Sequence, residues 1–286
     1  MSEGGHALGI NFSGNNIYYA VGDGLRQGAL SHIGRIDLNF PILDAILGPD
    51  PDLCSHISKV ISRLREKYTL TNIRLITYPQ LECWTTVPKI VYDDSREREA
   101  HMGFLIKGMD RKNIETFWNE MSNHDFRFLT IRDRAVMSLF EGFVPGFPNT
   151  EFCSDFEVGL QWVQHSGARG SFMSISCNPH TITVSSYLLG KLRAATCLRF
   201  RHLDDLPYIW KQSERHMKWM KGYHEEIMLF GNKTSRVVEM LRPFWDGSAE
   251  ISIMDNLYAM KVATEEQTYS FPLEEAFPAI MMATKG

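Results

Sequence analysis

The sequence predicts an α/β fold built from two halves that share one order of elements. Each half opens with three strand-like segments joined by tight turns and continues with alternating helix and strand patterns. In the first half, a helical pattern over 52–68 is followed by a strand pattern over 72–78, which is the strand–helix–strand unit of a right-handed crossover. Because the elements recur while the residues do not, we predict a structural duplication without a sequence repeat.

The first three strands are separated by turns of small residues. Ala7–Phe12 and Ile17–Val21 are apolar strand patterns, and the Ser13–Asn16 segment between them contains the glycine and asparagines that favour a tight hairpin turn. A third strand follows the turn at Gly22–Gly24 and extends to Asp37 with imperfect alternation. We therefore expect an antiparallel meander.

The rest of the first half contains one long helix and a candidate insertion. The helix begins in the proline- and aspartate-rich segment Gly48–Asp52, and its apolar residues recur at helical spacing as far as Tyr68. Between residues 79 and 166 we expect strands at Cys83–Val91, Asn113–Asn123 and Phe126–Ile131, and helices that begin at Ser95, span Arg132–Phe143 and run from Ser154 to His165.

The last of these helices begins with an acidic pair that needs an explanation. Ser154 and Glu157 have the spacing of a capping box, in which each side chain bonds the backbone N–H of the other residue. This interpretation explains Asp155 and Glu157 as parts of a helix start, without a catalytic role.

The second half repeats the meander and then alternates helices with strands. Its turns are expected at Cys177–His180 and Leu188–Lys191, between strands that are rich in β-branched and aromatic residues. The expected strands are Ser171–Ser176, Thr181–Tyr187, Leu192–Phe200, Glu226–Phe230, Glu250–Met254 and Tyr258–Val262, and the expected helices are Asp204–Lys221, Ser235–Phe244 and Leu273–Met282.

Composition and cysteine usage exclude several classes of protein. The formal charge of −4 and the scattered lysines and arginines give no basic stripe, so a nucleic-acid partner is not expected. The five cysteines are odd in number, widely spaced and without a CxxC pair, which indicates reduced thiols. The sequence shows no signal peptide and no apolar run long enough for a membrane span. We therefore predict a cytoplasmic protein.

The order of elements and the segment Gly9–Gly14 resemble the actin-like ATPase superfamily, whose fold is ribonuclease H-like. Its members end their first strand with Gly-Ile-Asp-x-Gly-Thr/Ser, and this chain has Gly9-Ile10-Asn11-Phe12-Ser13-Gly14. The chain is similar to bacterial members with a subdomain inserted in the first half, namely PilM, FtsA and the cytoplasmic part of GspL, and to an uncharacterised Bacteroidetes family of this fold. The resemblance implies mixed five-stranded sheets in two domains, 1–166 and 167–270, with an insertion at about 79–152 and a C-terminal helix, 271–286, that completes the first domain.

The resemblance also implies that three loops surround a nucleotide. In the first phosphate loop, Asn11–Asn16, the superfamily's aspartate is replaced by Asn11, and a neutral amide is a poorer ligand for Mg²⁺ than a carboxylate. In the second, Ser174–Thr181, the aspartate position is Ser174 and Pro179 removes a backbone donor. The adenosine loop, Phe230–Thr234, keeps one glycine of the usual pair. The residues that would contact a nucleotide are Asn11, Ser13, Gly14, Asn15, Ser174, Asn178, Thr181, Gly231 and Asn232.

Two functions remain open at this point. The missing acids lead to the first hypothesis, a non-catalytic scaffold or interaction protein with a PilM-like fold and a degenerate ATPase site, which works with an unidentified protein partner or as a homodimer. The alternative is an ATP-binding protein, ATPase or kinase that uses unconventional phosphate loops. We assign no catalytic and no metal-binding residue, and ATP with Mg²⁺ is the cofactor left open. The loops also have a purely structural interpretation as hairpin turns between core strands.

Other groups of reactive residues are better explained by structure than by chemistry. Three histidines near the expected helix of the second half lack the spacing of a metal site, so we expect solvated helix ends. Cys177 and His180 share a turn but lack a third orienting group, which argues against a nucleophile–base pair. The apolar segment Met102–Ile106 is expected to be a buried face, and His216–Tyr223 to be core or an interface. The three histidines are His202, His216 and His224.

Overall fold

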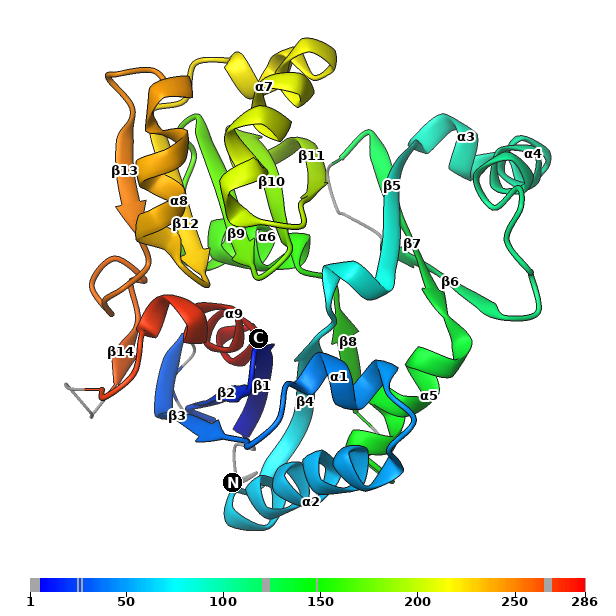
Figure 1. Ribbon diagram of the computed structural model, residues 1–286, viewed down its shortest axis with the longest axis vertical. Coiled ribbons are helices and arrows are strands. Elements are labelled where there is room, and N and C mark those ends of the chain that lie inside the picture. The colour runs from blue at the N-terminus through cyan, green and yellow to red at the C-terminus, as the bar shows by residue number, and fades with distance from the viewer. Residues whose placement is uncertain are drawn as a thin grey trace.

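The computed structural model describes residues 6–24, 26, 28–119, 124–147, 149–264 and 269–285. Within these residues, the strands form three sheets (Figure 1): a six-stranded sheet in the order β14-β3-β2-β1-β4-β8, a five-stranded sheet in the order β11-β10-β9-β12-β13, and a three-stranded sheet in the order β5-β7-β6. The two larger sheets each start with an antiparallel meander and continue with parallel strands. This is the duplicated α/β architecture that the sequence predicts.

The first sheet is formed by strands from the beginning of the chain and one short strand from near its end. Its strands are β1 (His6–Ser13), β2 (Asn16–Gly22), β3 (Ala29–Asp37), β4 (Leu70–Ile76), β8 (Thr150–Cys153) and β14 (Ala263–Thr264). One face packs against α1 (Ile42–Leu47), α2 (Pro51–Lys67) and α5 (Arg134–Phe143) in a shared apolar core. Asp50 caps α2 by accepting from the Asp52 N–H at 3.0 Å, which explains why this helix begins where the sequence predicts.

The second sheet repeats the meander followed by parallel strands, but different helices cover it. Its strands are β9 (Phe172–Asn178), β10 (Thr181–Leu188), β11 (Lys191–Arg199), β12 (Glu226–Gly231) and β13 (Glu250–Ile253). Two helices, α7 (Leu206–His216) and α8 (Thr234–Leu241), cover its outer face in a separate apolar core. Short 3₁₀ turns occupy Pro79–Leu81, Leu203–Asp205, Lys218–Lys221 and Arg242–Phe244.

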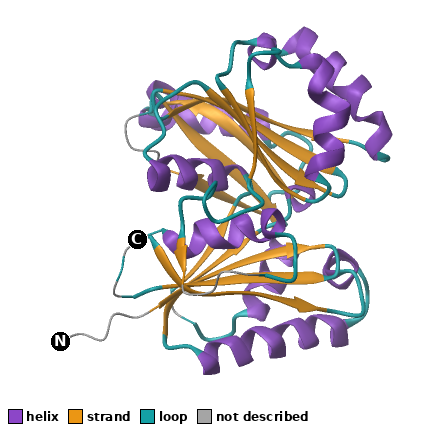
Figure 2. Ribbon diagram, turned by 90° about the vertical axis from the view of Figure 1, so that its left-hand side faces the viewer, coloured by secondary structure: helices purple, strands orange, loops and turns teal. Residues whose placement is uncertain are grey.

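Two helices lie between the sheets and join them (Figure 2). Both α6 (Phe156–Ser166) and α9 (Leu273–Thr284) contribute to one core that also contains side chains of both larger sheets. The helix α9 lies so close to the first sheet that a Cβ on Gly9 would be 2.0 Å from the Ala279 carbonyl oxygen, and one on Gly22 would be 2.5 Å from the Ala283 oxygen. On its other side, Phe277 packs on Phe230 of β12 with ring centroids 4.9 Å apart. The glycines are therefore required by helix packing.

The third sheet belongs to a small unit at one side of the molecule (Figure 1). It consists of β5 (Glu82–Pro88), α3 (Lys89–Asp93), α4 (Ser95–Leu105), β6 (Ile114–Asn119) and β7 (Phe126–Asp133). Its core is small, with four buried apolar residues: Val87, Ile106, Leu129 and Ile131. The next helix, α5, instead places Phe140 and Phe143 in the core shared with α2. The division of the chain into domains stays a prediction.

Several local predictions need correction. The expected helix Asp204–Lys221 ends at His216, where Met217 leaves the helical conformation and a 3₁₀ turn follows. The expected strand Tyr258–Val262 is a turn in which Lys261 has a φ of 53°, and the chain pairs with β3 only afterwards, so the first sheet has six strands rather than five. The expected strand Asn113–Asn123 is found over Ile114–Asn119, and its last four residues lie outside the described ranges. The short elements α1, α3 and β8 were not predicted.

Candidate functional site

Three loops meet where the two larger sheets approach each other. The β1–β2 hairpin closes at the Ser13–Asn16 pair, with Gly14 in the left-handed region at a φ of 58°. The β9–β10 hairpin closes at the Asn178–Thr181 pair. The loop after β12 is held against β9 because the Asn232 N–H donates to the Cys177 carbonyl oxygen at 2.7 Å. These are the three loops to which the sequence assigned nucleotide binding.

The carboxylate of Glu275, in the first turn of α9, lies between two of these loops. The Ser13 hydroxyl donates to Glu275 Oε2 at 2.6 Å, and the Asn232 side-chain amide donates to Glu275 Oε1 at 3.3 Å. Both oxygens of the carboxylate are thus used by donors from opposite sheets. An anion bound to the first loop would compete with this carboxylate for the same donors, so Glu275 acts as an internal anion at the site. Sequence reasoning missed it because the contact joins residues far apart in the chain.

Asn11 contributes to the same link through its side chain. Its amide nitrogen donates to the Glu275 backbone carbonyl oxygen at 3.0 Å. An ionised aspartate at this position has no proton to donate and would face that oxygen with a second acceptor. The neutral residue that distinguishes this chain from the superfamily pattern is therefore suited to holding α9 in place.

The other residues of the first and third loops, Gly14, Asn15 and Gly231, act through their backbone groups and not through side chains. The carbonyl oxygens of Gly14 and Asn15 accept from the N–H groups of Ile42 and Leu38, which attaches the hairpin to the start of α1. Gly231 has a φ of 98°, and a Cβ there would be 2.2 Å from the Cys177 carbonyl oxygen. A glycine is thus required at residue 231 by close backbone packing.

The register of the second hairpin identifies the residue that matches Asn11. Asn11 precedes the last paired residue of β1, Ser13, by two positions, and Ser176 precedes the last paired residue of β9, Asn178, by two positions. Ser176 is therefore the structural counterpart of Asn11, whereas Ser174 lies deeper in the sheet, where a Cβ on Gly159 of α6 would be 3.1 Å from its Oγ. Neither position carries an acid.

Two further residues of the second loop were predicted to contact a nucleotide, and one of them, Thr181, is buried while the other, Asn178, is partly exposed. Thr181 is fully buried, and its Oγ1 has no hydrogen-bond partner among the described residues. Asn178 is partly exposed and points its amide toward the Asp155 carboxylate at 3.4 Å. Thr181 is thus a core residue, and Asn178 is positioned by an acid from α6.

Asp155 is the functional candidate that the sequence assigned to another role. It is 3% exposed, and its Oδ1 accepts from the Ser176 hydroxyl at 2.7 Å. The pKa of this carboxyl is raised from 3.8 to about 6, mainly by burial and also by the nearby Glu82 carboxylate, against hydrogen bonds from the second hairpin that lower it. The site therefore holds one carboxyl that titrates near neutral pH.

The capping box predicted for α6 is only half formed. The Glu157 carboxylate accepts from the Ser154 N–H at 2.8 Å, as predicted, but the Ser154 hydroxyl accepts from Arg132 at 3.1 Å instead of capping the helix. Asp155 makes no cap hydrogen bond and faces the second hairpin. Asp155 follows the carboxyl end of β8, where ligand sites of α/β folds lie, but this strand was not predicted from the sequence and the signal was therefore missing.

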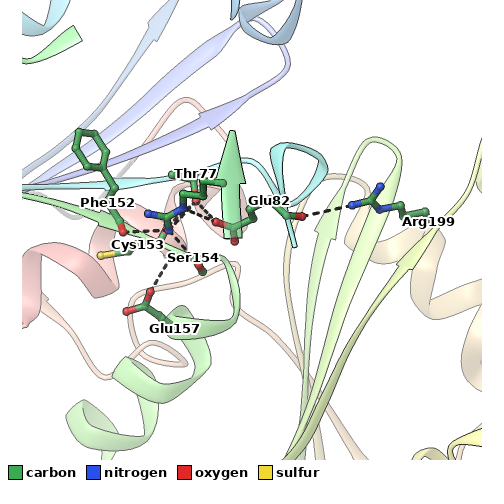
Figure 3. Close-up of polar contacts among 8 residues, drawn as sticks. Thr77, Glu82, Phe152, Cys153, Ser154, Glu157 and Arg199 are labelled. Atoms are coloured by element: carbon green, nitrogen blue, oxygen red, sulfur yellow. Dashed lines mark hydrogen bonds and ion pairs between the residues drawn. The ribbon is translucent and has the colours of Figure 1, made fainter. Parts of the chain in front are cut away.

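A buried ionic network around Glu82 connects the small unit to both larger sheets (Figure 3). Arg132 of β7 pairs with Glu82 of β5 at 2.9 Å, and both side chains are at most 5% exposed. Thr77, after β4, donates to the same Glu82 oxygen at 2.8 Å. Arg199 of β11 donates to the Glu82 backbone carbonyl oxygen at 3.4 Å. Glu82 therefore lies at the junction of the three sheets.

The remaining reactive residues do not form a second site. Cys177 is buried and its pKa is raised by burial, while His180 is exposed, so they form no nucleophile–base pair. No cluster of three or more metal-ligating side chains occurs among the described residues. The expectation of solvated histidines is wrong for His224, which is 5% exposed and hydrogen-bonded to Ser186 at 3.1 Å, with its pKa lowered by burial.

Two apolar segments had been expected to be buried or at an interface. In the segment Met102–Ile106, Ile106 is buried but Phe104 is 81% exposed, so the predicted buried face is wrong for Phe104. In His216–Tyr223, Met220 is buried in the second core and Tyr223 is exposed.

In the part of the chain that the structure describes, no helix is both long and apolar enough to span a membrane.

Comparison with known proteins identifies the fold. No protein-family model matches this sequence, and no curated protein sequence matches it significantly. A Bacteroides thetaiotaomicron protein with an actin-like ATPase fold and unknown function is 13% identical, with a TM-score of 0.58 over 90% of this chain and 95% of that chain. A chain of the PilM–PilN type IV pilus biogenesis complex is 10% identical, with a TM-score of 0.66 over 97% of both chains.

A third solved structure belongs to a secretion system. The cytoplasmic domain of EpsL, an inner-membrane component of the type II secretion system of Vibrio cholerae, is 8% identical, with a TM-score of 0.52 over 98% of this chain and 96% of that chain. At these identities the similarity shows the fold alone. The predicted resemblance is confirmed at that level: this chain has the actin-like ATPase fold.

Proposed function

We propose that this chain is a non-catalytic, actin-like interaction protein in which an internal carboxylate occupies the phosphate-binding region. The observation that carries this proposal is the position of Glu275, whose two carboxylate oxygens accept from Ser13 of the first loop and Asn232 of the third. Hydrogen bonds to an ionised acceptor are stronger than neutral ones, so a nucleotide phosphate would have to displace a favourable contact.

The absence of carboxylates on the phosphate hairpins supports the same proposal. Asn11 and its counterpart Ser176 are neutral, and their side chains are already engaged with Glu275 and Asp155. Mg²⁺ is held in proteins by carboxylates together with phosphate oxygens and water, and phosphoryl transfer depends on that charge neutralisation. The two loops therefore lack the groups that would bring Mg²⁺ to a nucleotide.

The similar structures and the composition support a proposal about the kind of partner. The PilM–PilN complex is an assembly of proteins, and we propose a protein partner for this chain, with a second copy of the chain as the alternative. Five free cysteines fit a cytoplasmic location, and the net charge of −4 gives no support for nucleic acid. We therefore propose a cytoplasmic PilM-like scaffold.

Thermal unfolding with and without millimolar ATP or ADP and Mg²⁺ tests this proposal. Because a ligand that binds only the folded state raises the melting temperature, we expect no rise for the wild type. Glu275→Ala removes the internal anion and is expected to respond to pyrophosphate, whereas Glu274→Ala removes the neighbouring charge of the same helix turn and serves as the control. A Mg²⁺-dependent rise in the wild type would contradict the proposal.

A specific observation favours the alternative, an ATP-binding enzyme with unconventional loops. Asp155 is buried beside the second hairpin and has a pKa of about 6, which suits a general base near neutral pH. This function predicts that the wild type hydrolyses ATP above background and that Asp155→Asn abolishes the hydrolysis. It also predicts that ATP raises the melting temperature of the wild type in the thermal assay. A wild type without hydrolysis and without stabilisation would eliminate it.

A further inference from the structure

A groove separates the small three-stranded sheet from the five-stranded sheet, and its Arg199 end lies beside the second hairpin, where Arg199 pairs with Thr181. It encloses about 300 Å³ and is lined by β5 on one side and β11 on the other. The lining residues used below are Cys83, Trp84 and Thr86 of β5 and Ala195, Cys197 and Arg199 of β11. Both strands are the outermost members of their sheets, so each has one edge without a paired strand among the described residues (Figure 1).

The backbone groups on the free edge of β5 are identified by its pairing with β7. The Lys89 N–H donates to the Asp125 carbonyl oxygen at 2.8 Å, so residue 89 faces β7. Because residues that exchange ladder hydrogen bonds alternate along an antiparallel strand, Trp84 and Thr86 direct their N–H and C=O groups away from β7. Glu82 follows the same alternation, and its carbonyl oxygen accepts from Arg199 across the groove.

The free edge of β11 follows from the same reasoning. The Phe200 N–H donates to the His180 carbonyl oxygen at 3.0 Å, so residue 200 faces β10. By alternation, Ala195 and Cys197 direct their N–H and C=O groups away from β10 and toward the groove that they line. The groove therefore has a row of free backbone donors and acceptors on both sides.

Two contacts bracket the groove and fix the relative direction of its walls. At one end Arg199 Nη2 donates to the Glu82 carbonyl oxygen at 3.4 Å. At the other end the Leu192 N–H donates to His124 Nε2 at 3.1 Å, close to Pro88, which pairs with Phe126. The walls run antiparallel and are bridged by side chains, which holds the two backbones farther apart than the roughly 4.8 Å of directly paired strands.

The central part of each free edge lacks the features that usually prevent strand pairing. Such features lie only at the ends, namely Pro88 on β5, the basic residues Lys191, Arg193 and Arg199 on β11, and an irregularity in the pairing of β11 with Ser186 and Tyr187. Proteins protect exposed edges with charged residues, prolines or bulges. The central residues of β5 and β11, 83–87 and 194–198, contain no charged residue and no proline. Arg199 lies at the end of the groove and forms no ion pair with the described residues. The central part of each edge is therefore open to backbone pairing, next to one positive charge.

We propose that the groove binds an extended segment of a partner protein, which pairs with the free edges of both β5 and β11 and places an acidic side chain near Arg199. Strand addition obtains affinity from main-chain hydrogen bonds and selectivity from side-chain contacts. The inference rests on the proposed function as an interaction protein and assigns its binding surface. It does not depend on whether the three loops bind a nucleotide.

The test uses short random linear peptides displayed as a library and selected on the wild-type protein. Selected peptides are expected to be rich in acidic and β-forming residues. Thr86→Pro and Ala195→Pro each remove one outward N–H without removing a ladder hydrogen bond. Because each variant loses a backbone hydrogen bond and gains a steric block, we expect peptide dissociation constants to rise about tenfold or more.

Thr116→Pro is the matched control. It also replaces an exposed threonine, but on the opposite edge of the same sheet, where residue 113 faces β7 and residue 116 therefore faces outward. This variant is expected to bind the peptides like the wild type. Hydrogen exchange should show protection of the amides of Trp84, Thr86, Ala195 and Cys197 when peptide is bound.

Three outcomes would overturn the proposal. The peptides could bind Thr86→Pro and Ala195→Pro as tightly as the wild type, they could protect amides elsewhere in the protein, or the library could yield no binder. A concentration-dependent dimer that Thr86→Pro disrupts would instead assign the groove to a second copy of this chain and overturn the foreign segment. Stabilisation of the wild type by ATP and Mg²⁺ would contradict the proposed function and leave these peptide measurements unaffected, so the two failures are distinguishable.

Discussion

Replacing Asp155 with asparagine tests the electrostatics of the candidate site. Burial raises the pKa of this carboxyl from 3.8 to about 6, so the folded protein binds a proton more tightly than the unfolded chain. The contribution of Asp155 to stability is therefore complete below about pH 4 and is lost as the pH rises through about 6. Asparagine keeps an acceptor for the Ser176 hydroxyl and carries no charge at any of these pH values.

The magnitude follows from the difference between the two pKa values. A rise of about two pH units corresponds to roughly 3 kcal/mol of unfolding free energy, since each unit is worth about 1.4 kcal/mol. Asp155 is 3% exposed, so solvent screens this term little. We expect Asp155→Asn to be close to wild-type stability near pH 4 and up to about 3 kcal/mol more stable than wild type near pH 8.

Urea unfolding of both proteins across this pH range measures the effect. The midpoint and the slope give the free energy at each pH, and an unchanged slope shows that the compactness of the two end states is unaltered. The difference between variant and wild type should grow between about pH 4 and pH 6 and level off at higher pH. Curves that stay parallel over the whole range would refute the reasoning, because Asp155 would then not titrate within it.

Three further predictions concern packing and reactivity. Arg132→Met leaves the buried Glu82 carboxylate without its ion-pair partner and should lower the unfolding free energy by about 3–5 kcal/mol in urea titrations, whereas adding Glu82→Leu should recover much of that loss. Gly9→Ala places a methyl group against the α9 backbone and should lower the unfolding free energy by about 1–3 kcal/mol or more, which would appear as a lower melting temperature. An unchanged melting temperature would show that α9 can move away at no cost. Cys83 is exposed and Cys177 is buried with a raised pKa, so a thiol reagent should label the first rapidly and the second only after unfolding, as peptide mass mapping would reveal.

Local chemistry predicted most of the architecture. The glycine and asparagines of Ser13–Asn16 produce the first hairpin, and the polar break before residue 51 starts α2 with Asp50 as its cap. The short elements α1 and α3 escaped prediction because five or six residues give too little periodicity. The segment Tyr258–Val262 has the composition of a strand, but its tertiary surroundings place it in a turn, and propensity alone does not determine pairing.

The candidate site was harder to predict because its contacts are not local. The three loops were found from turn chemistry, yet Glu275 reaches them from α9, more than two hundred residues after Ser13. Asp155 was explained by a sequence pattern that holds for Glu157 and fails for Ser154, whose hydroxyl is taken by Arg132 of the neighbouring sheet. A local motif cannot reveal such competition between partners from other strands.

The distribution of contacts indicates which parts of the molecule can move relative to each other. One apolar core contains α6, α9 and side chains of both larger sheets, and Glu275 adds a polar link between the loops at its edge. Separating the two sheets would expose this core to water at about 25 cal/mol for each Å² of apolar surface, so we expect the two sheets to stay together beside the three loops. The groove between β5 and β11 is bridged at its ends by hydrogen bonds from Arg199 and to His124, and Trp84 and Ala195 of its walls also pack against this shared core. Because the outward backbone groups of β5 and β11 already face the groove, the proposed partner segment would pair with them without separating the two larger sheets.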